Sequence, residues 1–107
     1  GDMALDITVT HEADECTVCV NGEVDVSNAA ELRSALEAAL IGGTSKITAD
    51  FSDVSYIDST GIGVLVGIAH RAQEIQAVFV VAHPQKNVAR VFDLLGVTED
   101  LNVREND

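Results

Sequence analysis

The chain has 107 residues, of which 47% are hydrophobic and 22% charged, and this composition predicts a single folded globular domain. Eighteen acidic residues against six Lys and Arg give a formal net charge of -12, with no Lys or Arg in residues 1–32. This charge disfavours binding to nucleic acids and membrane surfaces, and it suits either a basic protein partner or a solvated surface. Because long apolar spans and a signal-peptide pattern are both lacking, we expect a cytoplasmic protein.

The first part of the chain predicts a β-hairpin. Apolar and polar side chains alternate in "ALDITVTHE" (4–12), which is typical of a strand, and a turn at 14–15 leads into a second alternating stretch, "CTVCVNGEV" (16–24). Because successive side chains of a strand leave opposite faces, Cys16 and Cys19 should point apart. We therefore interpret them as structural cysteines and not as a redox or zinc pair.

The next segment predicts a helix and a third strand. Ser27 is the predicted N-cap of a helix whose apolar stripe continues to Gly42 and Gly43, where the helix should end. The segment "KITADFSDV" (46–54) then reads as a strand with a buried face. These elements give the hairpin a helix to cover it and a further strand to pair with.

The second half of the chain repeats the alternation of helix and strand. From Thr60 the apolar period becomes helical, and residues 77–82 form a continuous apolar strand of the kind that is buried on both faces. Pro84 suits the first turn of a last helix, which Gly96 should close. The tail from residue 97 has room for one more short element.

The order of these elements defines the expected fold. Two strands followed by alternating helices and strands predict a single α/β domain over residues 3–107, with a mixed sheet that is mostly parallel after the hairpin and is covered by helices. Gly1 and Asp2 precede Met3, and we interpret them as a cloning remnant outside the domain.

The segment "YIDSTGIGVLVG" (56–67) suggests three kinds of chemical site, namely a nucleophilic serine, a dinucleotide-binding loop and a magnesium site. Each of them is disfavoured by other residues of the sequence. A nucleophilic Ser59 needs an adjacent base, and the three histidines are scattered. The glycines resemble a dinucleotide-binding loop, but the third glycine comes one residue late. A structural role also explains Gly63 and Gly67, since they could form a bare helix face that packs on the sheet. Four acids near the predicted strand ends could bind magnesium at a phospho-aspartate site: Asp25, Asp50, Asp53 and Asp58. Such a site also needs a lysine after a late strand, which is lacking, so these acids are better explained as caps of turns and helices. We expect no enzyme, metal or cofactor.

A fourth interpretation is a helix start that can also be modified. Asp58 or Ser59 can accept hydrogen bonds from the free N–H groups of the first helical turn. A phosphate on Ser59 would lie at the positive end of the helix, where those donors tolerate it, and would add roughly -1.5 to -2 charge. Such a change alters a surface without unfolding the domain, which suits a switch of partner.

Three segments, in order, resemble STAS domains, specifically the small bacterial anti-sigma factor antagonists. They are "GEVDVSNAAELRSAL" (22–36), "ADFSDVSYIDSTGIGVLVG" (49–67), which is the most specific, and "VVAHPQKNVARVFDLLGV" (80–97). The resemblance covers nearly all of residues 5–103. It implies a non-enzymatic regulator that binds an anti-sigma factor, itself a serine kinase of the histidine-kinase-like ATPase type, and so releases a sigma factor.

The resemblance also implies a site. The kinase would phosphorylate Ser59, with Thr60 a weaker candidate, and a serine phosphatase would restore binding. The implied partner surface matches Asp25, Asp58, Ser59, Thr60, Gly61, Ile62 and Gly63, where the glycines let a partner approach. Residues 71–81 lack the glycine expected between the second helix and fourth strand, so that turn should be unusual. The alternatives are a STAS interaction module of a stress-signalling or transport complex without a phospho-switch, and a weak nucleotide-binding domain.

Overall fold

Five strands and three helices make up the computed structural model, which describes residues 4–105. The predictions for Gly1 and Asp2, and for the outermost ends of the domain, lie outside these residues. In chain order the elements are β1 (Asp6–Glu12), β2 (Glu15–Val24), α1 (Ala29–Ile41), β3 (Lys46–Ile57), α2 (Ser59–Glu74), β4 (Val78–Ala82), α3 (Lys86–Leu94) and β5 (Val103–Arg104).

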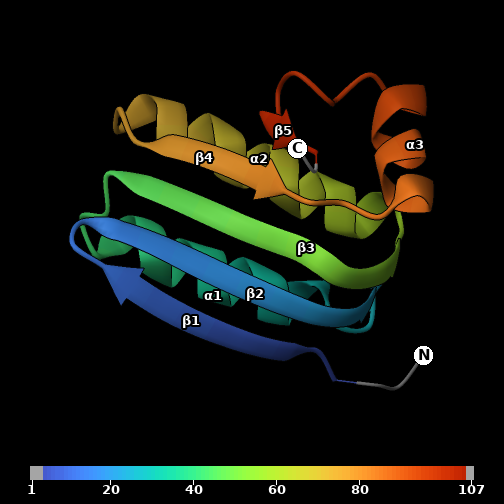
Figure 1. Ribbon diagram of the computed structural model, residues 1–107, viewed down its shortest axis with the longest axis horizontal. Helices are drawn as coiled ribbons and strands as arrows, with labels where there is room; N and C mark the ends of the chain where they lie inside the picture. Colours follow the sequence, from blue (N-terminus) through green and yellow to red (C-terminus); the bar gives the residue numbers. More distant parts are fainter. Residues whose placement is uncertain (1–3, 106–107) are drawn as a thin grey trace.

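The strands form one mixed sheet in the order β1-β2-β3-β4-β5. β1 pairs with β2 antiparallel, and all later neighbours pair parallel, as the sequence predicted. Figure 1 shows α1 and α2 side by side on one face of the sheet, with α3 at the end where β3 passes into α2. Because β2 and β3 are parallel neighbours, their carboxyl ends meet at that same end, where the loops that follow them come together.

One apolar core lies between the sheet and the helices. The predicted stripe of α1 is buried, and the rings of Phe51 in β3 and Phe92 in α3 lie with centroids 6.5 Å apart, so α3 is tied to the same core. The buried stripe of α1 consists of Ala29, Leu32, Leu36, Ala39 and Leu40.

The two cysteines take the positions expected of structural residues. Cys16 is buried in the core, whereas Cys19 is half-buried, and both are free thiols. Burial raises the pKa of Cys16, and partial burial raises the pKa of Cys19 with help from the carboxylates of Asp50 and Asp53. A thiol with a raised pKa forms less of the reactive thiolate, so neither residue has the character of a redox cysteine.

Two predicted helix starts are wrong by one or two residues. The N-cap of α1 is Asn28 and not Ser27, because the N–H of Ser27 donates to the Asp25 carboxylate at 2.9 Å and so belongs to the preceding turn. The N-cap of α3 is Gln85 in an extended conformation, so Pro84 lies just before the helix and not in its first turn. In both cases a residue that was predicted to begin the helix lies in the loop before it.

The turn between α2 and β4 is unusual, as the missing glycine predicted. Gln76 adopts a left-handed φ of 61°. Its N–H donates to the carbonyl of Gln73 at 3.1 Å and the N–H of Ala77 to that of Ala72 at 2.8 Å, which is the Schellman pattern. The end of α3 has the same pattern with Gly96 at φ 71°. Gln76 therefore occupies a position that normally favours glycine.

We expect Gln76→Gly to stabilise the domain by about 0.5–1 kcal/mol. Removing Cβ relieves a left-handed strain of roughly 1–2 kcal/mol, and the greater freedom of glycine in the unfolded chain offsets part of that gain. Urea unfolding would measure the free energy, with Gly96→Ala as the matched change, which should destabilise. A Gln76→Gly variant no more stable than wild type would show that the Gln76 side chain stabilises the turn in another way.

Candidate functional site

The site is built where β2 and β3 end. The loop from β2 to α1 and the junction of β3 with α2 lie side by side, because the N–H of Asp58 donates to the carbonyl of Val24 at 3.1 Å. This arrangement brings Asp25, in the first loop, to the same end of the molecule as Asp58 and Ser59. The structure thus brings these three residues, which belong to two separate segments of the sequence, to one end of the domain.

Asp58 holds the two segments together with both of its carboxylate oxygens. As the N-cap of α2, its Oδ1 accepts from the N–H of Gly61 at 2.9 Å, while Oδ2 accepts from the N–H of Val26 at 3.0 Å. Of the two cap candidates, Asp58 rather than Ser59 therefore supplies the side-chain cap. Ser59 is the first residue of α2 and is exposed.

Asn28 organises the loop from inside, a role that was not predicted from the sequence. Its side chain is 3% exposed, its Nδ2 donates to the carbonyl of Glu23 at 2.8 Å, and its Oδ1 accepts from the N–H of Asp25 at 2.9 Å. The amide thus satisfies one backbone group near the end of β2 and one in the loop that follows it. The available signal was an asparagine placed directly before the apolar stripe of α1.

Asn28→Ala should lower the free energy of unfolding by about 2 kcal/mol. The change leaves the N–H of Asp25 and the carbonyl of Glu23 without their partner at a part-buried position. Asn87→Ala is the matched control, since the Nδ2 of Asn87 also donates to a backbone carbonyl, that of Ser55 at 2.8 Å, but in an exposed setting. Equal losses in the two variants, measured by urea unfolding, would contradict a special role for Asn28.

Gly61 is required by packing inside the domain. A Cβ at this position would lie 2.6 Å from Cγ1 of Val24 and 2.8 Å from Cγ1 of Ile57. The side chain of the next residue, Ile62, is only 4% exposed. These two members of the predicted partner surface therefore face the core, and they shape the surface through the backbone of the first turn.

Gly63 and Gly67 face the opposite way, which corrects the structural account given for them. Both are exposed, and no atom lies within 4 Å of the position of a Cβ, so they do not pack on the sheet. They line a shallow hollow of about 120 Å³ between α1 and α2, beside the ion pair of Arg71 and Glu37 at 2.6 Å. Gly63 keeps the surface next to Ser59 bare, because it is four residues further along the helix.

Two of the predicted acids act as caps: Asp25 accepts from the backbone of its turn, and Asp58 from the first turn of α2. Asp50 instead lies within β3, where it accepts from the N–H of Ser52 at 3.0 Å, so the prediction of a cap is wrong for this residue. Across residues 4–105, no group of three or more His, Cys, Asp or Glu side chains is arranged to hold a metal ion. In the same stretch, no helix is both long and apolar enough to span a bilayer.

Comparison with known proteins adds an independent line of information. The family model for the STAS domain matches residues 5–106. The anti-sigma-B factor antagonist of Staphylococcus epidermidis is 33% identical over 104 residues, which cover 96% of this chain and 95% of that protein.

Two solved structures share the fold. The anti-sigma factor antagonist SpoIIAA in its unphosphorylated form superposes with a TM-score of 0.81 at 18% identity, over 95% of this chain and 89% of that one. The Bacillus cell fate determinant SpoIIAA in its phosphorylated form superposes with a TM-score of 0.74 at 17% identity, over 95% and 92% of the two chains.

Proposed function

The chain belongs to the STAS domain family, among its anti-sigma factor antagonists, and from this membership we propose that it binds an anti-sigma factor through the surface around Ser59 and that phosphorylation of Ser59 ends the binding. Binding of the anti-sigma factor would release the sigma factor for transcription, and phosphorylation would let the anti-sigma factor capture it again. This is the role of a cytoplasmic regulatory protein that works by changing partners, not by catalysis.

The position of Ser59 is the observation that carries the proposal. Its hydroxyl is exposed on the first residue of α2, while Asp58 supplies the helix cap. A phosphoryl group added here would meet the positive end of a helix dipole and would displace no core contact. The modification would therefore change the charge of the surface while the fold stays intact, as a reversible switch requires.

The partner follows from the family and from the chemistry of a serine switch. We propose an anti-sigma factor of the histidine-kinase-like ATPase type that holds ATP against the docked α2 start. The Ser59 hydroxyl would attack the γ-phosphorus, its proton would pass to a base of the kinase, and the bond to ADP would break. A serine phosphatase would hydrolyse the phosphoester with water, release inorganic phosphate and restore the binding form.

The intact mass of the protein after incubation with ATP and a lysate of the source organism tests the proposal. Wild type and Thr60→Ala should gain one phosphoryl group, and Ser59→Ala should gain none. The reverse pattern for the two variants would move the modification to Thr60. If no form gains mass in a lysate that phosphorylates a control antagonist, the chain is a STAS interaction module without a phospho-switch.

A further inference from the structure

The loop between β2 and α1 exposes an apolar side chain beside the proposed switch. Val26 is 75% exposed, and its backbone N–H is bonded to Asp58, the residue directly before Ser59. Tyr56, near the end of β3, is 48% exposed and stands opposite Glu23 in the strand register. An exposed apolar side chain contributes little to folding, so Val26 can be buried by a partner without disturbing the domain.

The Val26 loop is held in one conformation. The N–H of Val26 donates to Oδ2 of Asp58 at 3.0 Å, and the neighbouring Asp25 N–H donates to the buried Asn28 side chain at 2.9 Å. The N–H of Ser27 is also bonded, to the Asp25 carboxylate. Because the loop is ordered before any partner arrives, little conformational entropy remains to be lost when Val26 is buried in a complex.

The same carboxylate couples Val26 to Ser59. Asp58 binds the backbone of Val26 with one oxygen and caps the helix that begins with Ser59 with the other. A protein that docks over Ser59 therefore meets the Val26 side chain as part of the same surface. The distance between the two does not depend on a flexible segment.

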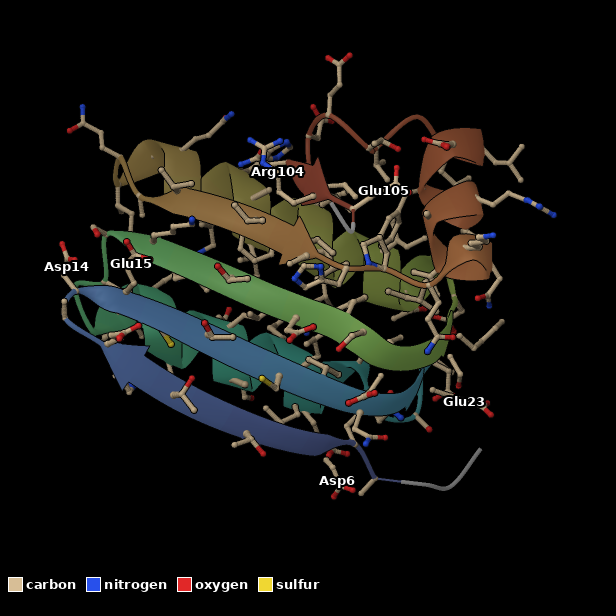
Figure 2. The ribbon with its side chains drawn as sticks, viewed as in Figure 1. Asp6, Asp14, Glu15, Glu23, Arg104 and Glu105 are labelled. Carbon is tan, nitrogen blue, oxygen red and sulfur yellow. The ribbon has the colours of Figure 1, made fainter. Side chains whose placement is uncertain are left out.

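The charges around Val26 indicate which kind of protein covers it. Glu23 extends into solvent at this end of β2 (Figure 2), and Asp25 and Asp58 lie in the loop and at the helix cap. Residues 1–32 contain no Lys or Arg. A second copy of this chain would bring like charges together across a two-fold axis, which disfavours self-association through this surface.

We propose that Val26, supported by Tyr56, is the apolar anchor through which the chain binds its anti-sigma factor, which offers an apolar pocket edged by Lys or Arg. This inference rests on the proposed function. The apolar contact supplies affinity, the surrounding acids select a basic rim, and the adjacent Ser59 carries the switch. The anchor and the switch are thereby separate side chains on one rigid surface.

The test compares Val26→Ser with Ile41→Ser, because Ile41 is 79% exposed but lies at the far end of α1. Purified histidine-kinase-like anti-sigma factors of the source organism are titrated one at a time with each unphosphorylated form by calorimetry. Val26→Ser should weaken binding about ten-fold or more, and Ile41→Ser should bind like wild type. Both variants should keep the wild-type melting temperature, since both sites are exposed.

Equal binding by Val26→Ser and wild type would overturn the anchor while the proposed function stands. A similar loss in both variants would overturn it too, because the effect would not be local. Binding of no anti-sigma factor by wild type would reject the proposed function and the anchor together. A wild-type dimer in sedimentation that Val26→Ser abolishes would assign Val26 to self-association and contradict a second protein as its partner.

Discussion

Phosphorylation of Ser59 is expected to weaken binding to the anti-sigma factor about 100-fold or more, which corresponds to roughly 2.7 kcal/mol. In the proposed complex the Ser59 hydroxyl must approach the γ-phosphate of the bound ATP, so a phosphate on Ser59 would occupy the same space and add like charge next to it. The effect is confined to the interface, because Asp58 and not Ser59 caps the helix.

Three variants, compared with phosphorylated and unmodified wild type, separate the parts of this effect. Ser59→Ala should bind the anti-sigma factor like wild type and should not respond to kinase and ATP. Ser59→Asp carries less charge and bulk than a phosphoserine and should lose less affinity, while Thr60→Asp controls for charge on the neighbouring exposed residue. Calorimetric titration measures all of them. A phosphorylated wild type that binds as tightly as the unmodified form would contradict the switch.

The elements of the fold could be predicted because their signals are local and repeated. The alternation in residues 4–24, the helical stripe of α1 and the apolar run of β4 each extend over several positions, so one ambiguous residue does not change the assignment. The parallel sheet then follows from the alternation of helices and strands. The unusual turn at Gln76 was also predictable, since a missing glycine at a helix end is visible in one sequence.

The details of the site depended on contacts that lie far apart in the chain. Ser27 and Asn28 are both common capping residues, and the Asn28 side chain is fixed by a bond to the carbonyl of Glu23, near the end of β2. The bond from the Val26 N–H to Asp58 joins residues 32 positions apart. No local pattern contains that information, so the sequence could predict which segments matter but not how they are joined.

The sequence contains enough information to predict which glycines of α2 face the core, but the spacing of the glycines alone predicts the wrong ones. Leu65 is a buried residue of the helix, and Gly61 lies four residues before it, on the same face. Gly63 and Gly67 lie on the other face, although their four-residue spacing predicts a bare helix face packed against the sheet. The periodicity of the neighbouring side chains, rather than the spacing of the glycines, determines which glycine is buried.

Gly61→Ala and Gly63→Ala should therefore have opposite effects on stability. Gly61→Ala should lower the free energy of unfolding by about 3 kcal/mol, because the new Cβ overlaps Val24 and Ile57, whose branched side chains have little freedom to turn away. Gly63→Ala should raise it by up to about 1 kcal/mol, since alanine favours a helix over glycine and no atom lies nearby. Urea unfolding of both variants and wild type measures the difference.

The same pair also separates folding from partner binding. Gly63→Ala adds a methyl group to the bare surface four residues after Ser59, so it should weaken docking of the anti-sigma factor although the domain itself is more stable. Gly61→Ala should act through the displaced first turn of α2, and its loss of affinity should appear together with its loss of stability. If Gly63→Ala binds like wild type, the partner does not cover this turn of the helix, and the docking surface must lie on the side of the Val26 loop.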